Sequence, residues 1–332
     1  MSSLRRARTW LFVRRRFQFV ATVAMVIVLT GTCGALLVVP NWVLPKLHAA
    51  QPTSIGSVRA AADDDARLTA VRRTLEPFGQ LVTEQVPTGN DQESLVVGHP
   101  AQRAEIDILA GELATATTAV TDVWGTGWAQ SALVVVASNP SEFAALVRST
   151  NMPADVAAAS VADPFVPGTQ PTGQRVVFSA DAGRRLDRDG MRTLLRHELT
   201  HIAARAQTVD GAPQWMLEGF AEFVAHLGTG HRFVDIAPTV ATRIRAGDIP
   251  RDLPADVDFA GTGAVAAYEQ GWSVCAFIAD KFDRSRLVEL YRRIAAGKQD
   301  PASEDRIMRD VLGTSRTDLV ADWRNWLSAH AA

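Results

Sequence analysis

Cysteine and tyrosine are both scarce in this chain, whose 332 residues include two of each. Cys33 lies in an apolar run near the amino terminus and Cys275 in an expected late helix, which excludes a disulfide within the folded domain. Cys275 is interpreted as a small core residue. No internal repeat is present. The chain must therefore fold around an ordinary hydrophobic core, and residues 63–332 are numerous enough to bury a large one.

Excess charge of one sign is also lacking, because 34 Lys and Arg face 36 Asp and Glu, a net charge of −2. The distribution is uneven. Residues 1–16 contain six arginines and no acid, so residues 17–332 hold 28 bases against 36 acids, a net charge of −8. An acidic domain has no electrostatic reason to bind nucleic acid, and no nucleic-acid partner is expected.

A segment of 23 uncharged residues, Phe17 to Val39, follows the arginine-rich start. About 20 apolar residues span a bilayer, and the arginines favour a cytoplasmic amino terminus. The sequence therefore predicts a basic cytoplasmic tail (1–16), a signal anchor in the lipid bilayer (17–39), a linker (40–62) and an extracytoplasmic domain (63–332) at the cell membrane. A cleaved signal peptide, which would give a secreted protein, is the alternative. The arginines before Phe17 also weakly resemble a twin-arginine export signal.

The stretch from His197 to His201, His-Glu-Leu-Thr-His, is the most informative part of the sequence. Residues four apart share one face of a helix, so the two imidazoles can converge on one metal ion. Glu198 is displaced around the helix and cannot be a third ligand, but it is well placed to polarise a metal-bound water. The alternative is a solvated helix turn with two surface histidines.

The residues around this motif favour a half-buried helix. Arg175 to Ser179 is typical of a short buried strand, and a polar turn follows, in which Asp187 or Asp189 can cap a helix. Residues 191–206 contain no Pro or Gly. Their apolar positions recur at helical spacing, namely Leu194, Leu195, Leu199, Ile202 and Ala203. Half-buried histidines need a partner, and a metal ion is a suitable one.

A second helix is expected after Pro213, with a short connection that lets it pack back against the first. This segment is strongly apolar, so its two carboxylates, Glu218 and Glu222, are costly to bury unless each has a partner. We assign Glu218 to the metal. Glu222 is expected to accept a hydrogen bond from the second ring nitrogen of His197 or His201. A solvated helix face is the alternative for Glu222.

The motif from His197 to His201, followed by Trp-Met-Leu-Glu-Gly-Phe-Ala-Glu from Trp215, resembles the gluzincin zinc metallopeptidases. The resemblance is closest to the peptidase MA-like families, typical of bacterial extracytoplasmic proteins, and more distant to the M1 aminopeptidases. It covers roughly residues 100–330. It implies one Zn²⁺ per chain held by His197, His201 and Glu218. The 16 residues between His201 and Glu218 are fewer than M1 enzymes usually have, without loss of a ligand.

Tyr268-Glu269-Gln270-Gly271 is similar to a Tyr-Glu-x-Gly helix start of M1 enzymes, whose tyrosine stabilises an oxyanion. The resemblance implies Tyr268 as the oxyanion donor. A packing tyrosine with a surface hydroxyl is the alternative. The Gly-x-Met-Glu-Asn sequence that anchors a substrate amino terminus in M1 enzymes is absent. An endopeptidase or a narrow-specificity peptidase is therefore favoured over an aminopeptidase.

The expected fold class is α+β. A zincin-like domain would combine a small mixed sheet with the motif helix and a mostly helical carboxyl-terminal part. Residues 63–100 are expected to be helix and loop, 101–180 the strand-containing part, 181–230 the metal-binding helices and 231–332 helical. Individual expectations are a helix at 63–85, a polar loop at 86–100, a helix at 101–124, strands at 132–137, 156–161 and 175–179, and helices at 231–246, 262–282, 284–296, 303–312 and 315–329.

The resulting hypothesis is a membrane-anchored zinc metallopeptidase in which Glu198 is the general base. Its partner would be a peptide or protein substrate, added as an extra strand beside strand 175–179 or a neighbour. A catalytically silent scaffold and a zinc hydrolase of a non-peptide substrate are the two alternatives. His226 follows Glu218 by eight positions and could approach the site, but both His226 and His231 are interpreted as solvated surface histidines.

Overall fold

The computed structural model describes residues 66–149 and 156–331. The predicted basic tail (1–16), signal anchor (17–39) and linker (40–62) lie outside these ranges. Among the helices of the described ranges, none combines the length and the apolar character needed to cross a membrane.

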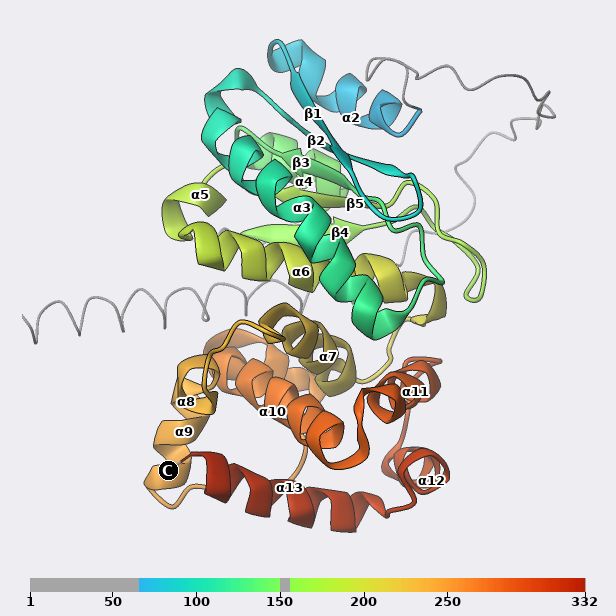
Figure 1. Cartoon of the computed structure of the whole chain (residues 1–332), viewed down its shortest axis with the longest axis vertical. Helices are drawn as coiled ribbons and strands as arrows, with labels where there is room; N and C mark the ends of the chain where they lie inside the picture. The colour runs from blue at the N-terminus through green and yellow to red at the C-terminus, as the bar shows by residue number, and fades with distance from the viewer. Residues whose placement is uncertain (1–65, 150–155, 332) are drawn as a thin grey trace, which may run out of the picture.

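One mixed sheet of five strands occupies the upper half of the molecule in Figure 1. The spatial order is β1-β2-β3-β5-β4. The inner pairs β2–β3 and β3–β5 are parallel, whereas β1–β2 and β4–β5 are antiparallel. The strands are β1 (Val82–Pro87), β2 (Glu93–Gly98), β3 (Leu133–Val136), β4 (Ala158–Val161) and β5 (Arg175–Phe178). The expected small mixed sheet is confirmed.

The amino-terminal part of the sheet corrects two expectations. The helix expected at 63–85 is shorter, because α2 (Leu68–Leu75) ends in a 3₁₀ turn with Pro77 in it, and the chain then turns at Gly79, whose φ is 146°. Residues 82–87 form β1 instead. Within the loop expected at 86–100, residues 86–87 end β1 and residues 93–98 form β2, which is buried between β1 and β3. Pairing with distant β3 stabilises β2, and a local pattern does not reveal it.

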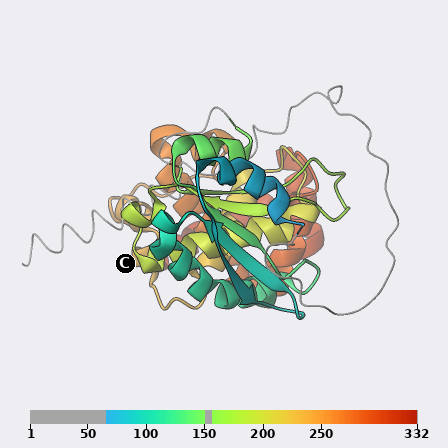
Figure 2. The same cartoon turned by 90° about the horizontal axis from the view of Figure 1, so that it is seen from above.

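Helices cover the sheet and carry the motif. α3 (Arg103–Trp124) packs against α6 (Arg188–Ala204), while α2 packs against α4 (Pro140–Val147) on the sheet (Figure 2). The apolar positions of α3 expected to face the core are buried: Ile106, Leu109, Leu113 and Val120. α6 also contacts β4 and β5, so the motif helix lies directly beneath one edge of the sheet.

The lower half of Figure 1 is helical, as expected for residues 231–332. Its central member is α10, which contacts α7, α9, α11 and α13 and whose buried face includes Cys275. The helices are α7 (Gln214–His226), α8 (Phe233–Ile236), α9 (Pro238–Arg245), α10 (Ala264–Phe282), α11 (Arg284–Ile294), α12 (Pro301–Leu312) and α13 (Arg316–His330). α6 and α7 therefore lie at the junction between the sheet layer and the helical layer.

Candidate metal centre

The motif helix α6 begins where the sequence places its cap. The Asp187 carboxylate accepts a hydrogen bond from the Gly190 N–H at 2.8 Å, which satisfies one of the free N–H groups of the first turn. The helix then presents His197 and His201 on one face toward α7. His197 is 1% exposed and Glu198 is buried beside it.

The connection between α6 and α7 is short and anchored. The Val209 N–H donates to the Ala295 carbonyl at 2.8 Å, just after α11, and the Thr208 hydroxyl is 3.0 Å from the Tyr291 hydroxyl. α7 then packs against α6 and carries Glu218 into the interior, where it is 2% exposed. The connection thus fixes the position of the third expected ligand relative to the first two.

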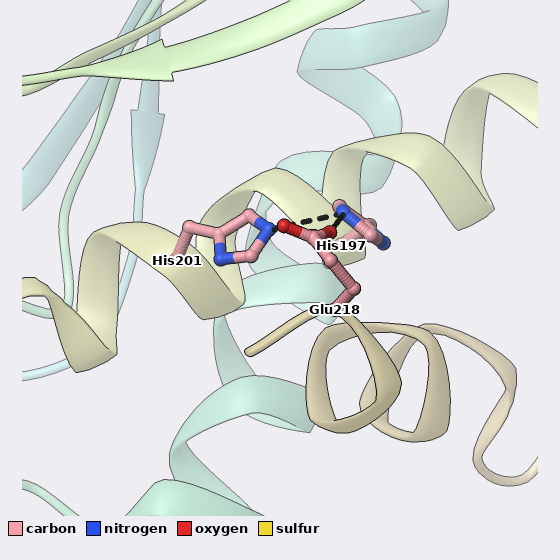
Figure 3. Close-up of side chains that lie close together, drawn as sticks. All are labelled: His197, His201 and Glu218. Atoms are coloured by element: carbon pink, nitrogen blue, oxygen red, sulfur yellow. Dashed lines mark hydrogen bonds and ion pairs between the residues drawn. The ribbon is translucent and has the colours of Figure 1, made fainter. Parts of the chain in front are cut away.

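Three ligand atoms meet between these helices (Figure 3). The Nε2 atoms of His197 and His201 are 3.1 Å apart. Glu218 Oε2 lies 3.4 Å from the first and 3.5 Å from the second. A zinc ion with ligands at about 2.0–2.1 Å in a tetrahedron separates neighbouring ligand atoms by about 3.3 Å. The triangle therefore fits zinc, and its chemistry, two imidazoles and a carboxylate, is typical of a catalytic zinc site.

The electrostatics of the three groups agree with a site for a cation. Burial alone would lower the pKa of His197, but contacts with Glu218 and Glu222 raise it well above its ordinary value. Burial alone would raise the pKa of Glu218, but the two histidines hold it below its ordinary value. Two acids and two imidazoles in one buried cluster need positive charge among them. A proton on His197, whose pKa is raised, can contribute such charge, and a divalent cation can replace it.

Glu198 lies on the same helix as the two histidines but outside the ligand triangle. Burial raises the pKa of its carboxyl group, and electrostatic interactions with the two histidine side chains oppose the shift. Ser160 of β4 is also close to this carboxylate. A buried carboxylate with a raised pKa is a stronger base than one in water. The placement is the one expected of a general base, and the role stays a prediction.

Glu222 lies one turn after Glu218, behind the ligand triangle. One carboxylate oxygen is 3.1 Å from His197 Nδ1, and the other is 3.3 Å from His226 Nε2. The sequence left open whether Glu222 contacts His197 or His201, and in the structure it contacts His197. A carboxylate there favours the tautomer that carries its proton on Nδ1 and leaves Nε2 free for a metal.

His226 is the residue that the sequence interpretation missed. It was expected to be solvated, but its side chain is 9% exposed and contacts Glu222. The signal was available in the sequence, because His226 follows Glu222 by four positions on one helix face. The contacts form a row from His197 through Glu222 to His226.

Tyr268 lies on α10, and the structure removes the surface alternative for it. The residue is 1% exposed, and its ring packs edge-on against Phe259 with centroids 5.1 Å apart. Its role as oxyanion donor stays a prediction. The other tyrosine, Tyr291, packs on Trp124 and Phe220 and contacts Thr208 through its hydroxyl.

A close helix crossing holds Glu218 in place. A methyl group added to Gly219 would lie 2.4 Å from the carbonyl oxygen of Gly271, so α7 and α10 touch through their backbones. The two glycines belong to the Glu218-Gly219 pair and to the Tyr268–Gly271 stretch that the sequence singled out. This crossing explains both glycines by packing alone.

A cavity of about 210 Å³ adjoins the ligand triangle, with His201 and Glu218 in its wall. Residues 160–162, at the carboxyl end of β4, form another side of it. β4 is the last strand of the sheet, whereas β5 is enclosed between β3 and β4. The edge strand beside the site is therefore β4. It is the neighbour of β5, the strand that the sequence analysis expected at 175–179.

Comparisons with protein-family models and with curated proteins found no match. Among solved structures, the M1 zinc metallopeptidase from Deinococcus radiodurans matches with 15% identity and a TM-score of 0.44, over 76% of this chain and 52% of that chain. A glutamate-to-alanine mutant of it gives a TM-score of 0.46 at 15% identity, over 76% and 53%. The same mutant bound to a Tyr-Ser-Ala substrate gives 0.46 at 15% identity, over 76% and 52%.

The chain spans about half the length of these solved proteins. At such TM-scores and identities the likeness is too low to carry an assignment of activity. The functional conclusion therefore rests on the residues of the site.

Proposed function

We propose that this protein is a zinc metallopeptidase that hydrolyses peptide bonds with Glu198 as general base. One observation carries the proposal: the ligand atoms of His197, His201 and Glu218 form a buried triangle with edges of 3.1, 3.4 and 3.5 Å. Such a triangle leaves one side open for water and substrate, as a catalytic zinc site requires.

The residues of the chain divide the chemistry among them. His197, His201 and Glu218 would hold a zinc ion, which would supply a Lewis acid. Glu198 takes a proton from the attacking water and passes it to the leaving amine. The Tyr268 hydroxyl donates a hydrogen bond to the negative charge that develops on the carbonyl oxygen. Glu222 orients His197 and takes no part in proton transfer to the substrate.

An extended peptide is the substrate form that the sheet supports best. β4 is short, lies beside Glu198 through Ser160, and pairs with β5 on one side only among the described strands. A peptide can add to such an edge by backbone hydrogen bonds. Substrate or inhibitor bound without strand pairing to β4, observed in a complex, would contradict this part of the proposal.

The proposal also includes a location. Six arginines before 23 uncharged residues support a signal anchor at 17–39 with the catalytic domain outside the cytoplasm. Protease added to intact cells should degrade the domain, while a tag at the amino terminus stays protected. Release of an untagged soluble domain into the medium would support the cleaved signal peptide instead.

The central experiment separates metal binding from hydrolysis. Glu198→Gln keeps the shape of the side chain but cannot accept a proton, so it should retain zinc and lose turnover. His201→Ala removes a ligand and should lose zinc. Turnover is measured on a quenched-peptide library with and without chelator, and zinc by metal analysis of the same preparations. Retained turnover of Glu198→Gln would remove the base from the mechanism, and full zinc occupancy of His201→Ala would remove the site.

The two alternatives from the sequence predict different outcomes. A silent scaffold would bind zinc and cleave no peptide, although an intact Glu198 argues against it. A hydrolase of another bond would also leave the peptide library uncut but would turn over ester or amide substrates of a different class, and this turnover would still depend on Glu198.

A further inference from the structure

The cavity beside the metal centre is large enough to hold a substrate side chain. Its volume is about 210 Å³, whereas apolar cavities of about 150 Å³ in proteins already bind benzene. It shares His201 and Glu218 with the ligand triangle, so a group inside it lies next to the reacting bond. Its remaining wall comes from the ends of α4, α6 and β4, the start of α7 and the loops beside them.

The apolar part of the wall is aliphatic, and the charged groups in it are already paired. The aliphatic side chains are Val147, Val161, Pro164, Ile202, Val209 and Leu217. Arg148 pairs with Asp163 at 2.6 Å. Arg205 donates to the Thr208 carbonyl at 2.9 Å and lies 3.4 Å from Asp210.

The other polar groups of the wall offer few interactions to a charged substrate side chain. Arg205 also stacks on the Phe165 ring, with its guanidinium carbon 4.5 Å from the ring centroid. The Gln174 amide donates to the Ile202 carbonyl at 2.9 Å. The carboxamide oxygen of Gln214 is buried without a hydrogen bond and can accept one from a substrate N–H. A charged side chain would therefore enter the cavity without a free counter-ion, whereas an apolar one would lose contact with water.

The position of the cavity along β4 decides which substrate residue it receives. β4 runs from Ala158 to Val161, and the cavity lies at its carboxyl end, at residues 160–162. Antiparallel pairing is the more stable arrangement for an added strand. A peptide antiparallel to β4 places its amino-terminal residues toward Ala162. Glu198, the proposed base, contacts Ser160, so the reacting bond is expected near that residue. The cavity extends beyond Ser160 to Ala162 and Pro164 and therefore lies on the amino-terminal side of the bond.

We propose that this cavity binds a large apolar side chain, of the size of Leu, Met or Phe, on the residue immediately before the cleaved bond. The inference rests on the proposed peptidase function and adds its substrate class. The enzyme is then an endopeptidase or a peptidase selective for large apolar residues, and the aliphatic wall of the cavity determines that selectivity.

The first test maps cleavage sites in a complex peptide mixture by mass spectrometry. Leu, Met and Phe should be enriched directly before the cut. Val209→Trp fills the cavity from the α6–α7 connection and should reduce the kcat/KM ratio of Phe over Ala substrates by about tenfold or more. Val257→Trp, at a valine that is 79% exposed, is the matched control and should leave the ratio unchanged. An unchanged ratio in Val209→Trp, or enrichment only after the cut, would overturn the proposal.

The second test measures binding and needs no turnover. N-acetylated hydroxamates of phenylalanine and of glycine share one metal-chelating group and differ only in the side chain that would enter the cavity. Calorimetry on the zinc-loaded wild-type protein should give a dissociation constant for the phenylalanine compound that is lower than that of the glycine compound by about tenfold or more. Equal affinities would overturn the cavity assignment and leave the metal site intact. If the protein takes up no zinc and binds neither compound, the proposed function is overturned, and this inference with it.

Discussion

Gly219 and Gly271 meet where α7 crosses α10, and a methyl group on Gly219 would lie 2.4 Å from the Gly271 carbonyl oxygen. Gly219 follows Glu218 directly, so the crossing sets the depth and rotation of the helix that carries this proposed third ligand. Gly271 follows Tyr268 by three positions on the opposite helix. One backbone contact therefore positions both the proposed metal ligand Glu218 and the tyrosine proposed as oxyanion donor.

Gly219→Ala should lower both stability and zinc affinity. The added methyl group overlaps backbone that cannot rotate away, and overpacking of this kind typically costs about 1–3 kcal/mol. Thermal unfolding and chelator competition measure the two effects. Gly111→Ala, on an exposed position of α3 where a Cβ meets only the end of an arginine at 3.9 Å, should be neutral or slightly stabilising. Equal stability of the two variants would contradict the close crossing.

Glu222→Gln should weaken zinc binding without removing a ligand. The carboxylate next to His197 Nδ1 fixes the tautomer, and loss of such a partner typically costs about 10- to 100-fold in metal affinity. His226→Ala removes the second contact of Glu222 and should have a smaller effect in the same direction. Competition with a chelator of known affinity gives both values. A Glu222→Gln affinity equal to that of wild type would leave Glu222 without its positioning role.

Zinc affinity should rise with pH through the neutral range. Burial alone would lower the pKa of His197, but Glu218 and Glu222 raise it well above its ordinary value in the metal-free protein. Zinc binds only the neutral imidazole, so protons compete with zinc until the pH exceeds this raised pKa. The apparent affinity should increase about tenfold per pH unit for each proton displaced. A chelator titration that is flat between about pH 6 and pH 8 would contradict this account.

Glu269 should make the protein less stable as the pH rises. Burial raises the pKa of this carboxyl to about 7 from 4.5, although the Val240 N–H donates to it at 2.7 Å. A carboxyl whose pKa is higher in the folded state than in the unfolded state stabilises the fold when it is protonated. This contribution is fully present below the pKa of the unfolded state and is lost as the pH rises through the pKa of the folded state. The free energy of unfolding should fall by about 3 kcal/mol through this group. Glu269→Gln should remove that part of the pH dependence in denaturant unfolding, whereas exposed Glu289→Gln should retain it.

Tyr268→Phe tests the oxyanion role separately from packing. The ring that packs on Phe259 remains, so thermal stability and zinc content should change little. Loss of one oxyanion donor typically reduces kcat by about 10²- to 10³-fold. Wild-type kcat with lowered stability would assign Tyr268 to packing alone.

The sequence predicted the parts of this structure that depend on local spacing. The positions of His197 and His201 follow from helix periodicity, and Glu218 and Glu222 follow from the cost of burying carboxylates in an apolar helix. The structure brings these four side chains into contact. The helix expected at 101–124 and the strands expected at 132–137 and 175–179 also agree with the structure.

The parts that the sequence did not predict depend on contacts between distant segments. β1 and β2 acquire their strand structure from each other and from β3, about forty residues further on. That β4 forms the edge of the sheet follows from strand order, which no local pattern contains. The contact of Gly219 with Gly271 is likewise a property of the folded helices.

The dependence of α7 on α10 also has a consequence for the order of events during synthesis. His197 and His201 are synthesised before Glu218. The helix of Glu218, α7, is held in place by α10, which contains Gly271 and is synthesised later. A nascent chain that ends before α10 can offer zinc two imidazoles but not a fixed third ligand. The complete set of three proposed ligands therefore forms only after most of the chain has been made and α10 has packed against α7.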